Sequence, residues 1–107
     1  MKTDRELLEL AAKAAGIELL EWDEEGQAYW IDQCLGEWWT PLLFDGDAFR
    51  LAVQLKLDVL FFDGFHEVHA GGDGITSAAV ESYSDHMAYA TRRAIVRAAA
   101  AIGEAMK

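Results

Sequence analysis

Apolar and polar residues follow a helical period at the start of the chain. Leucine and alanine recur every three or four positions over residues 4–15, which predicts an amphipathic helix. Thr3 and Glu6 match the capping box, in which each side chain bonds the backbone amide of the other. Gly16 favours the left-handed turn that commonly ends a helix. The pattern therefore predicts a first helix over residues 4–15.

The next apolar stretches are short and alternate in part with polar residues. Residues 17–22 and 27–32 both have this pattern, and the acidic turn 23–26 separates them. Two such runs joined by a short turn that contains glycine are typical of a β-hairpin. We expect Trp22 and Trp30 to lie near each other across the two strands.

The middle of the chain loses this alternation and then returns to a helical period. Within residues 33–44, Gly36 and Pro41 interrupt any strand ladder, so we expect an irregular segment there. Apolar residues recur at helical spacing over 46–56, and Asp45 precedes them as a suitable N-cap. A second helix is therefore predicted over residues 46–56.

Three further strands and a long helix are predicted for the rest of the chain. Apolar or alternating runs over 57–62, 65–70 and 75–83 indicate the strands, with glycine-rich turns between them. Ser84 or Asp85 then caps a final helix that continues almost to the end of the chain. Its buried face is expected to consist of small and aliphatic residues: Ala88, Thr91, Ile95, Ala99, Ile102 and Met106.

The order of elements predicts the fold class. The order is α-β-β-α-β-β-β-α, and hairpins make most of the strand connections, so the sheet should be largely antiparallel. We expect one α+β domain over residues 1–107, with a sheet of about 4–5 strands and helices packed on one face. The final helix is rich in alanine, and a homodimer through this helix is a further expectation.

Charge divides the chain into two parts. The net charge is −10, and residues 1–47 carry twelve acidic residues against three basic ones. No Lys or Arg occurs between Glu18 and Asp47. Such a surface repels nucleic acid and anionic membranes, and it fits a basic surface on another protein. The simpler explanation is that the acidic residues only keep the protein soluble.

Composition limits the class of protein and its location. Apolar residues make up 52% of the chain, enough for a hydrophobic core, and no apolar run reaches the length of a membrane span. The first residues are charged and helical in pattern, so we expect no signal peptide and a cytoplasmic location. Cys34 is the only cysteine and has acidic neighbours in sequence, which disfavours an internal disulfide and a thiolate nucleophile.

Four tryptophans fall within the acidic segment. Trp22 and Trp30 are expected in the core, whereas Trp38 and Trp39 are adjacent and should point in different directions, so that one of them is exposed. Exposed tryptophan is frequent at the centre of protein interfaces. The candidate protein-binding residues are the acidic and aromatic ones of this segment: Glu21, Asp23, Glu24, Glu25, Glu37, Trp38 and Trp39.

One cluster of basic residues occurs on the final helix. Its arginines could pair with the acidic residues of the same chain, or they could bind a phosphate or carboxylate group. In the second case an aromatic ring would stack on a nucleotide base. The candidate ligand-binding residues are then Trp39, Phe44, Arg92, Arg93 and Arg97.

Metal and phosphate sites have weak support in the sequence. His66 and His69 are three residues apart on a predicted strand, so their side chains should point to opposite faces. Asp45 and Asp47 are explained by the helix start. The glycine-rich stretch 71–74 leads into a strand and lacks the lysine of a phosphate-binding loop. We therefore expect no metal, no cofactor and no catalytic residue.

Several short stretches resemble a known group of proteins. They are the Leu-Leu-Glu-Leu-Ala-Ala-Lys-Ala-Ala-Gly stretch over 7–16, the Trp-x-Pro-Leu step over 39–42, the stretch 45–53 that begins Asp-Gly-Asp-Ala-Phe, and the stretch 91–99 that begins Thr-Arg-Arg-Ala-Ile. Together they make the chain similar to small phage and prophage accessory proteins of the NinX-like kind. Such proteins carry Asn before the proline, where this chain has Thr40. The resemblance implies a phage setting and brings no catalytic residue with it.

Three functional hypotheses follow from these features. The first is a non-enzymatic phage or prophage accessory protein that acts by binding. It would mimic nucleic acid through its acidic surface and so inhibit a host defence protein. The second is a protein that binds or sequesters a nucleotide. The third is a metal-dependent hydrolase that would use Asp45, Asp47 and His66.

Overall fold

The computed structural model describes residues 2–31, 36–72, 79–82 and 86–106. Its helices and strands, with one short 3-10 turn, follow in this order: α1 (Asp4–Ala15), β1 (Leu19–Asp23), β2 (Ala28–Ile31), β3 (Glu37–Trp39), α2 (Asp45–Leu55), β4 (Asp58–Phe62), the turn η1 (Asp63–Phe65), β5 (Glu67–Gly71), β6 (Ala79–Ser82) and α3 (Met87–Ala105). The α+β class is therefore confirmed.

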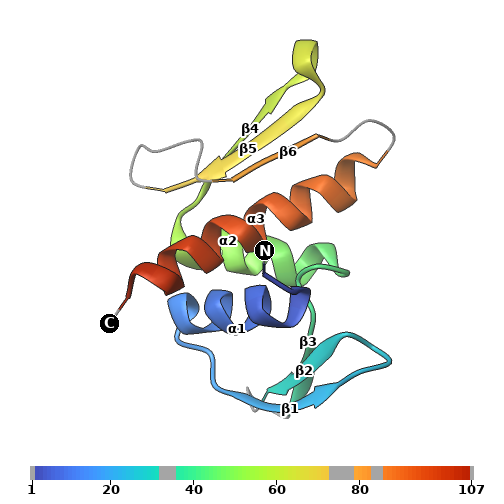
Figure 1. Ribbon diagram of the computed structural model, residues 1–107, viewed down its shortest axis with the longest axis vertical. Helices are drawn as coiled ribbons and strands as arrows, with labels where there is room; N and C mark the ends of the chain where they lie inside the picture. The colour runs from blue at the N-terminus through green and yellow to red at the C-terminus, as the bar shows by residue number, and fades with distance from the viewer. Residues whose placement is uncertain (1, 32–35, 73–78, 83–85, 107) are drawn as a thin grey trace.

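The strands form two sheets, and the helices lie between them. Both sheets are antiparallel and three-stranded, with the orders β1-β2-β3 and β4-β5-β6. In Figure 1 the first sheet lies at one end of the molecule, the helices in the middle and the second sheet at the other end. The prediction of one sheet with helices on one face was wrong in this respect. Because α2 separates the two groups of strands, each group pairs only with its sequence neighbours.

The first helix forms as its sequence pattern predicts. The Thr3 side chain accepts a hydrogen bond from the Glu6 backbone amide at 3.1 Å, and the Glu6 carboxylate accepts one from the Thr3 amide at 2.9 Å. These bonds favour the ionised carboxylate and lower the pKa of Glu6. Gly16 ends the helix with a φ of +71°. The capping box and the glycine stop are both confirmed.

The first sheet contains the predicted hairpin and one further strand. The turn sets a register in which Trp22 lies opposite Tyr29, so the expected pairing of Trp22 with Trp30 was wrong. The irregular segment predicted over 33–44 contains β3, which pairs with β2. Residues 32–35, including Cys34, lie outside the described residues. The strand was missed because it has only three residues and ends just before Pro41.

The second helix begins one residue earlier than expected and without the expected cap. Phe44 occupies the N-cap position and makes no side-chain cap bond, while Asp45 is already helical. Asp47 is buried, and its carboxylate accepts hydrogen bonds from the Thr40 amide at 3.0 Å and from Arg50 at 2.5 Å. The Asp47 carboxylate therefore ties the helix to the end of β3, a role that the sequence did not predict.

The second sheet follows the predicted strand order with shorter strands. A 3-10 turn over residues 63–65 replaces the two-residue turn expected at Asp63–Gly64, and His66 adopts a left-handed conformation with a φ of +52°. The strand β5 therefore starts at Glu67. The strand expected over 75–83 is present as β6 over Ala79–Ser82. Residues 73–78 and the predicted cap residues 84 and 85 lie outside the described residues.

The final helix is buried on more than one face. Ala90, Ala94 and Ala98 pack against the second sheet, whereas Ile95 and Val96 belong to a core shared with α1, α2 and the first sheet. The predicted single buried face was therefore wrong, and Ala88 and Met106 at its ends are exposed. The alanine-rich surface is covered within one chain. This leaves little of it for the homodimer that the sequence suggested.

The crossing of α1 and α3 is very close. A Cβ atom added to Gly103 of α3 would lie 1.9 Å from the backbone oxygen of Leu10 in α1. The alanines Ala11 and Ala12 of α1 and Ala99 of α3 are buried in the same core. Small side chains thus allow the two helices to approach each other.

Among the described residues, no helix is both long and apolar enough to cross a membrane.

We expect Gly103→Ala to lower the free energy of unfolding by about 3 kcal/mol or more, because the methyl group would force the two helices apart. Denaturant unfolding followed by circular dichroism measures this change. Gly64→Ala is the matched control: its added Cβ would meet no atom within 4 Å, so the change should stay within about 0.5 kcal/mol. Equal midpoints for the two variants would contradict the close crossing.

Candidate protein-binding face

The outer face of the first sheet carries a row of acidic and aromatic side chains. Glu21, Trp30 and Trp38 lie directly opposite one another on β1, β2 and β3, so their side chains share one face. Tyr29 and Trp39, their neighbours along the strands, point to the other face and are buried. We call the outer row and the adjoining acidic turn, which are Glu21, Asp23, Glu24, Glu25, Trp30 and Trp38, the acidic face.

The two outer tryptophans form a rigid pair. Their ring centroids lie 5.0 Å apart with an interplanar angle of 73°, which is an edge-to-face contact. Gly36 also lies close to the ring of Trp30: an added Cβ there would lie 2.8 Å from Cζ2 of Trp30. Trp38 is 46% exposed, whereas Trp30 is half-buried. The pair therefore presents fixed aromatic surface to solvent.

The acidic side chains of this face differ in their internal contacts. The Glu24 carboxylate accepts a hydrogen bond from the Trp22 indole at 2.6 Å, and the Asp23 carboxylate accepts one from the Gly26 amide at 2.9 Å. Glu21 and Glu25 are exposed and have no ion pair or hydrogen bond to another described residue. Within the described part of the chain, these two carboxylates are therefore available to an incoming cation.

The remaining protein-binding candidates divide between surface and core. Glu37 is exposed at the start of β3, at the edge of the first sheet. Trp39 is 5% exposed and packs in the main core, so its side chain does not reach the surface. The sequence had assigned Trp30 to the core. Tyr29 and Ile31, its neighbours along β2, are both buried, so the Trp30 side chain faces outward. All three residues are apolar, and the sequence therefore carried no signal of which one faces out.

The inner face of this sheet is fixed to α1 through Tyr29. The Tyr29 hydroxyl donates to the Glu9 carboxylate at 2.5 Å and accepts from Nε of Arg5 at 2.9 Å. The Arg5 guanidinium also lies 5.2 Å from the centroid of the Trp22 ring. Burial and the bond to Glu9 raise the pKa of Tyr29. The basic side chain of Arg5 is therefore engaged by Tyr29 and Trp22, away from the outer tryptophans.

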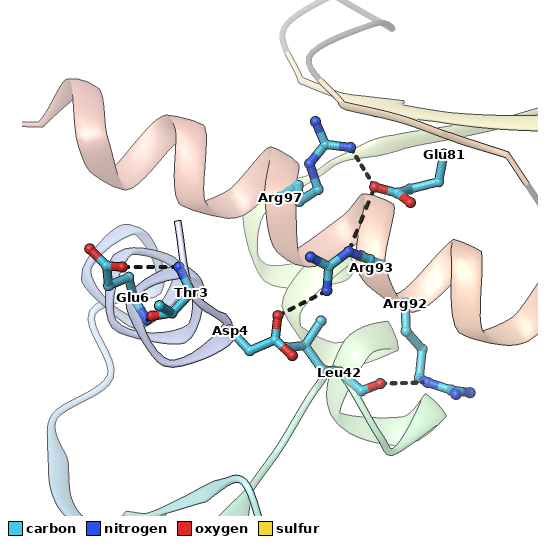
Figure 2. Close-up of polar contacts among 8 residues, drawn as sticks. All are labelled: Thr3, Asp4, Glu6, Leu42, Glu81, Arg92, Arg93 and Arg97. Atoms are coloured by element: carbon cyan, nitrogen blue, oxygen red, sulfur yellow. Dashed lines mark hydrogen bonds and ion pairs between the residues drawn. The ribbon is translucent and has the colours of Figure 1, made fainter. Parts of the chain in front are cut away.

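The three arginines of α3 are engaged within the chain. Figure 2 shows Arg93 between the carboxylates of Asp4 and Glu81, with Arg97 on the same Glu81 oxygen. Arg92 donates to the Leu42 carbonyl at 3.0 Å and, as an ion pair, to Asp45 at 2.6 Å. Burial is the largest single influence on the pKa of Arg93 and lowers it, but the hydrogen bond to Asp4 and the nearby charges of Asp4 and Glu81 together outweigh burial and raise this pKa.

The nucleotide site suggested by the sequence does not come together around these arginines. Each guanidinium already has an acidic partner, so a phosphate group would have to displace a carboxylate. Trp39 is buried and cannot stack on a base, whereas Phe44 is 59% exposed at the start of α2. Together these contacts use the arginines to hold α3 against α1, α2 and β6.

The residues of the metal hypothesis are also separated. Asp45 pairs with Arg92, and Asp47 is bonded to Thr40 and Arg50. His66 lies at the tip of the β4–β5 hairpin, far from α2 (Figure 1). In the part of the chain that the structure describes, no three residues among His, Cys, Asp and Glu are grouped as metal ligands.

Comparisons of this chain with protein families, with curated proteins and with solved structures found no match.

We expect Tyr29→Phe to remove a pH-dependent part of the stability. Because the pKa of Tyr29 is raised in the folded state, its contribution is complete below pH 10 and is lost as the pH rises through the folded pKa. At pH 8 the loss of the hydroxyl should cost about 1 kcal/mol. Urea unfolding at pH 8 and pH 11 should therefore show a smaller difference between the variant and the wild type at pH 11. A difference that grows with pH would contradict the assignment.

We expect Glu81→Gln to lower the free energy of unfolding by about 1–2 kcal/mol, because two half-buried guanidinium groups would lose a charged partner. Glu104→Gln is the control, since its pair with Lys2 is on the surface and should contribute less than about 0.5 kcal/mol. Thermal unfolding of both variants gives the comparison. Equal losses would show that the Glu81 contacts are no stronger than an ordinary surface pair.

Proposed function

We propose that this protein acts by binding, and that its acidic face occupies a basic site on another protein. The observation that carries this proposal is the cross-strand row of Glu21, Trp30 and Trp38 on a sheet whose sequence segment contains no Lys or Arg. Opposite charges steer association and fix the orientation of a complex. The aromatic pair supplies the contact area near the centre of such a site.

The geometry favours a cationic partner in particular. An Arg or Lys side chain that lies over Trp38 gains a cation–π contact, and the carboxylate of Glu21 or Glu25 can accept its hydrogen bonds. Because Gly36 and Trp38 already hold the Trp30 ring, little side-chain freedom is lost on binding. A flat row of exposed acids and fixed aromatics thus complements a surface rich in arginine and lysine.

A basic site that fits this face is one that normally holds nucleic acid. A protein with spaced carboxylates competes for such a site by replacing the phosphates. The resemblance to phage and prophage accessory proteins supports a host defence protein as the target and the host cytoplasm as the location. In this proposal the protein is a non-enzymatic inhibitor that blocks nucleic-acid binding by its target.

The other two hypotheses have less support. Binding of a nucleotide by Arg92, Arg93 and Arg97 would require the loss of their pairs with acidic residues of the same chain. A metal-dependent hydrolase would require Asp45 and Asp47 to leave their contacts with arginine and to meet His66 from the far hairpin. The acidic face needs no such rearrangement.

We expect Glu21→Lys/Glu25→Lys to weaken binding to the target by at least about tenfold, because both free carboxylates would become repulsive charges. The target is first captured from host lysate on the immobilised protein and identified by mass spectrometry. Its affinity is then measured by calorimetry with the purified proteins. The affinity should fall with added salt, and duplex DNA or RNA should compete with the acidic protein.

Two further variants test whether the acidic face itself makes the contact. Trp38→Ala should weaken binding by at least about tenfold through the loss of the aromatic surface. Glu67→Lys/Glu104→Lys changes the net charge by the same amount on β5 and α3, and it should leave the affinity within about threefold. A target that binds all three variants alike, or that nucleic acid does not displace, would refute the proposal.

A further inference from the structure

An apolar groove lies between α2, α3 and β4, at a distance from the acidic face. Its cavity has a volume of about 360 Å³. Ala48 and Ile95 are buried and form its floor. Phe49, Phe61 and Met87 form its walls and are 68%, 52% and 48% exposed. Exposed aromatic walls around a small buried floor are typical of a surface that another protein covers.

The apolar surface continues along α2 beyond the groove. Phe44 and Val53 are 59% and 58% exposed, and both flank Phe49 on the same helix or its N-cap. Few monomeric proteins expose so many large apolar side chains together. The burial of apolar surface drives proteins to associate, so a patch of this kind indicates a surface that a partner covers.

The strand β4 borders the groove and has an open edge. Among the described residues it pairs only with β5 in the sheet order β4-β5-β6, and four of its five residues are apolar. Natural edge strands are commonly protected by lysine, proline or a bulge, and β4 has none of these along its ladder with β5. Phe61 belongs to this strand and also forms a wall of the groove. The open edge and the groove are therefore one continuous surface.

Charge identifies a second copy of this chain as the occupant. A chain of net charge −10 repels another copy over most of its surface. At the groove, however, Asp45 is neutralised by Arg92, and Asp47 on the same helix by Arg50. Asp58, at the start of β4, is exposed and is the acid on this strand without an ion pair among the described residues, so a basic partner would gain little here. Another copy therefore meets less repulsion here than at the acidic face, and it offers the same unpaired edge and the same apolar side chains.

We propose that this chain forms a homodimer in which the β4 strands of two copies pair antiparallel about a two-fold axis at Leu60. In this register Phe61 lies opposite the partner's Val59, on the side of the sheet that faces the groove. Each Phe61 then closes the groove of one copy against the other. The two sheets become one sheet of six strands, and the acidic faces remain at the outer ends of the dimer.

The oligomeric state tests this proposal directly. Light scattering coupled to size-exclusion chromatography should give twice the 11.9 kDa mass of one chain at micromolar to millimolar concentration. Phe49→Ser and Phe61→Ser should each raise the dissociation constant of the dimer by at least about tenfold. Phe65→Ser is the control: this residue is 76% exposed on η1, outside the groove, and its loss should leave the dissociation constant unchanged.

Cross-linking tests the register and remains informative where a serine variant folds poorly. In a Cys34→Ser background, Leu60→Cys places two thiols opposite each other on the axis, at a separation that a disulfide can span. Mild oxidation should give a linked dimer, whereas Phe65→Cys should not. A monomer over the whole concentration range, a dimer unaffected by both groove variants, or a dimer without the Leu60 cross-link would overturn the proposal. If the protein is a monomer, the groove does not bind a second copy of the chain. That result would not bear on the function proposed for the acidic face, which is tested separately.

Discussion

The close packing of α3 against α1 is the constraint on which the rest of this structure depends. With Gly103 at the crossing and alanines along both helices, the backbones approach so closely that no Cβ fits between Gly103 and Leu10. A helix with such small side chains can be covered on one side by α1 and α2 and on the other side by the second sheet. The second sheet packs directly on α3 and the first sheet shares a core with it, so both depend on this helix.

The charged residues of α3 also hold this helix against its neighbours, in addition to the close packing of its small residues. The helix carries three arginines that form ion pairs with its neighbours. Arg92 pairs with Asp45 of α2, Arg93 with Asp4 of α1 and Arg97 with Glu81 of β6. This use of the arginines has a functional consequence. The basic cluster that looked available for a ligand in the sequence is structural, and the net charge of −10 comes from acidic residues elsewhere in the chain. This is the charge on which the proposal of a cationic partner for the acidic face rests.

The sequence predicted the features that depend on neighbouring residues. The capping box at Thr3, the stop at Gly16 and the first hairpin are local, and they were found correctly. The strand β3 was missed because its three residues gain their structure from β2. The two covered sides of α3 were missed because a helix of alanines has few polar positions to mark a solvent face. Trp30 was assigned wrongly because Tyr29, Trp30 and Ile31 are all apolar, so the sequence does not mark which face of the strand is outward.

The two proposed surfaces lie at opposite ends of the molecule, and this arrangement suggests how they work together. The acidic segment is concentrated in the first sheet, so self-association through the second sheet adds little repulsion between like charges (Figure 1). A dimer built this way presents two copies of the acidic face, pointing away from each other. A target with two basic sites would then bind the second face at a high effective concentration. Affinity for an extended or dimeric target could thus be strong even where each acidic face binds weakly.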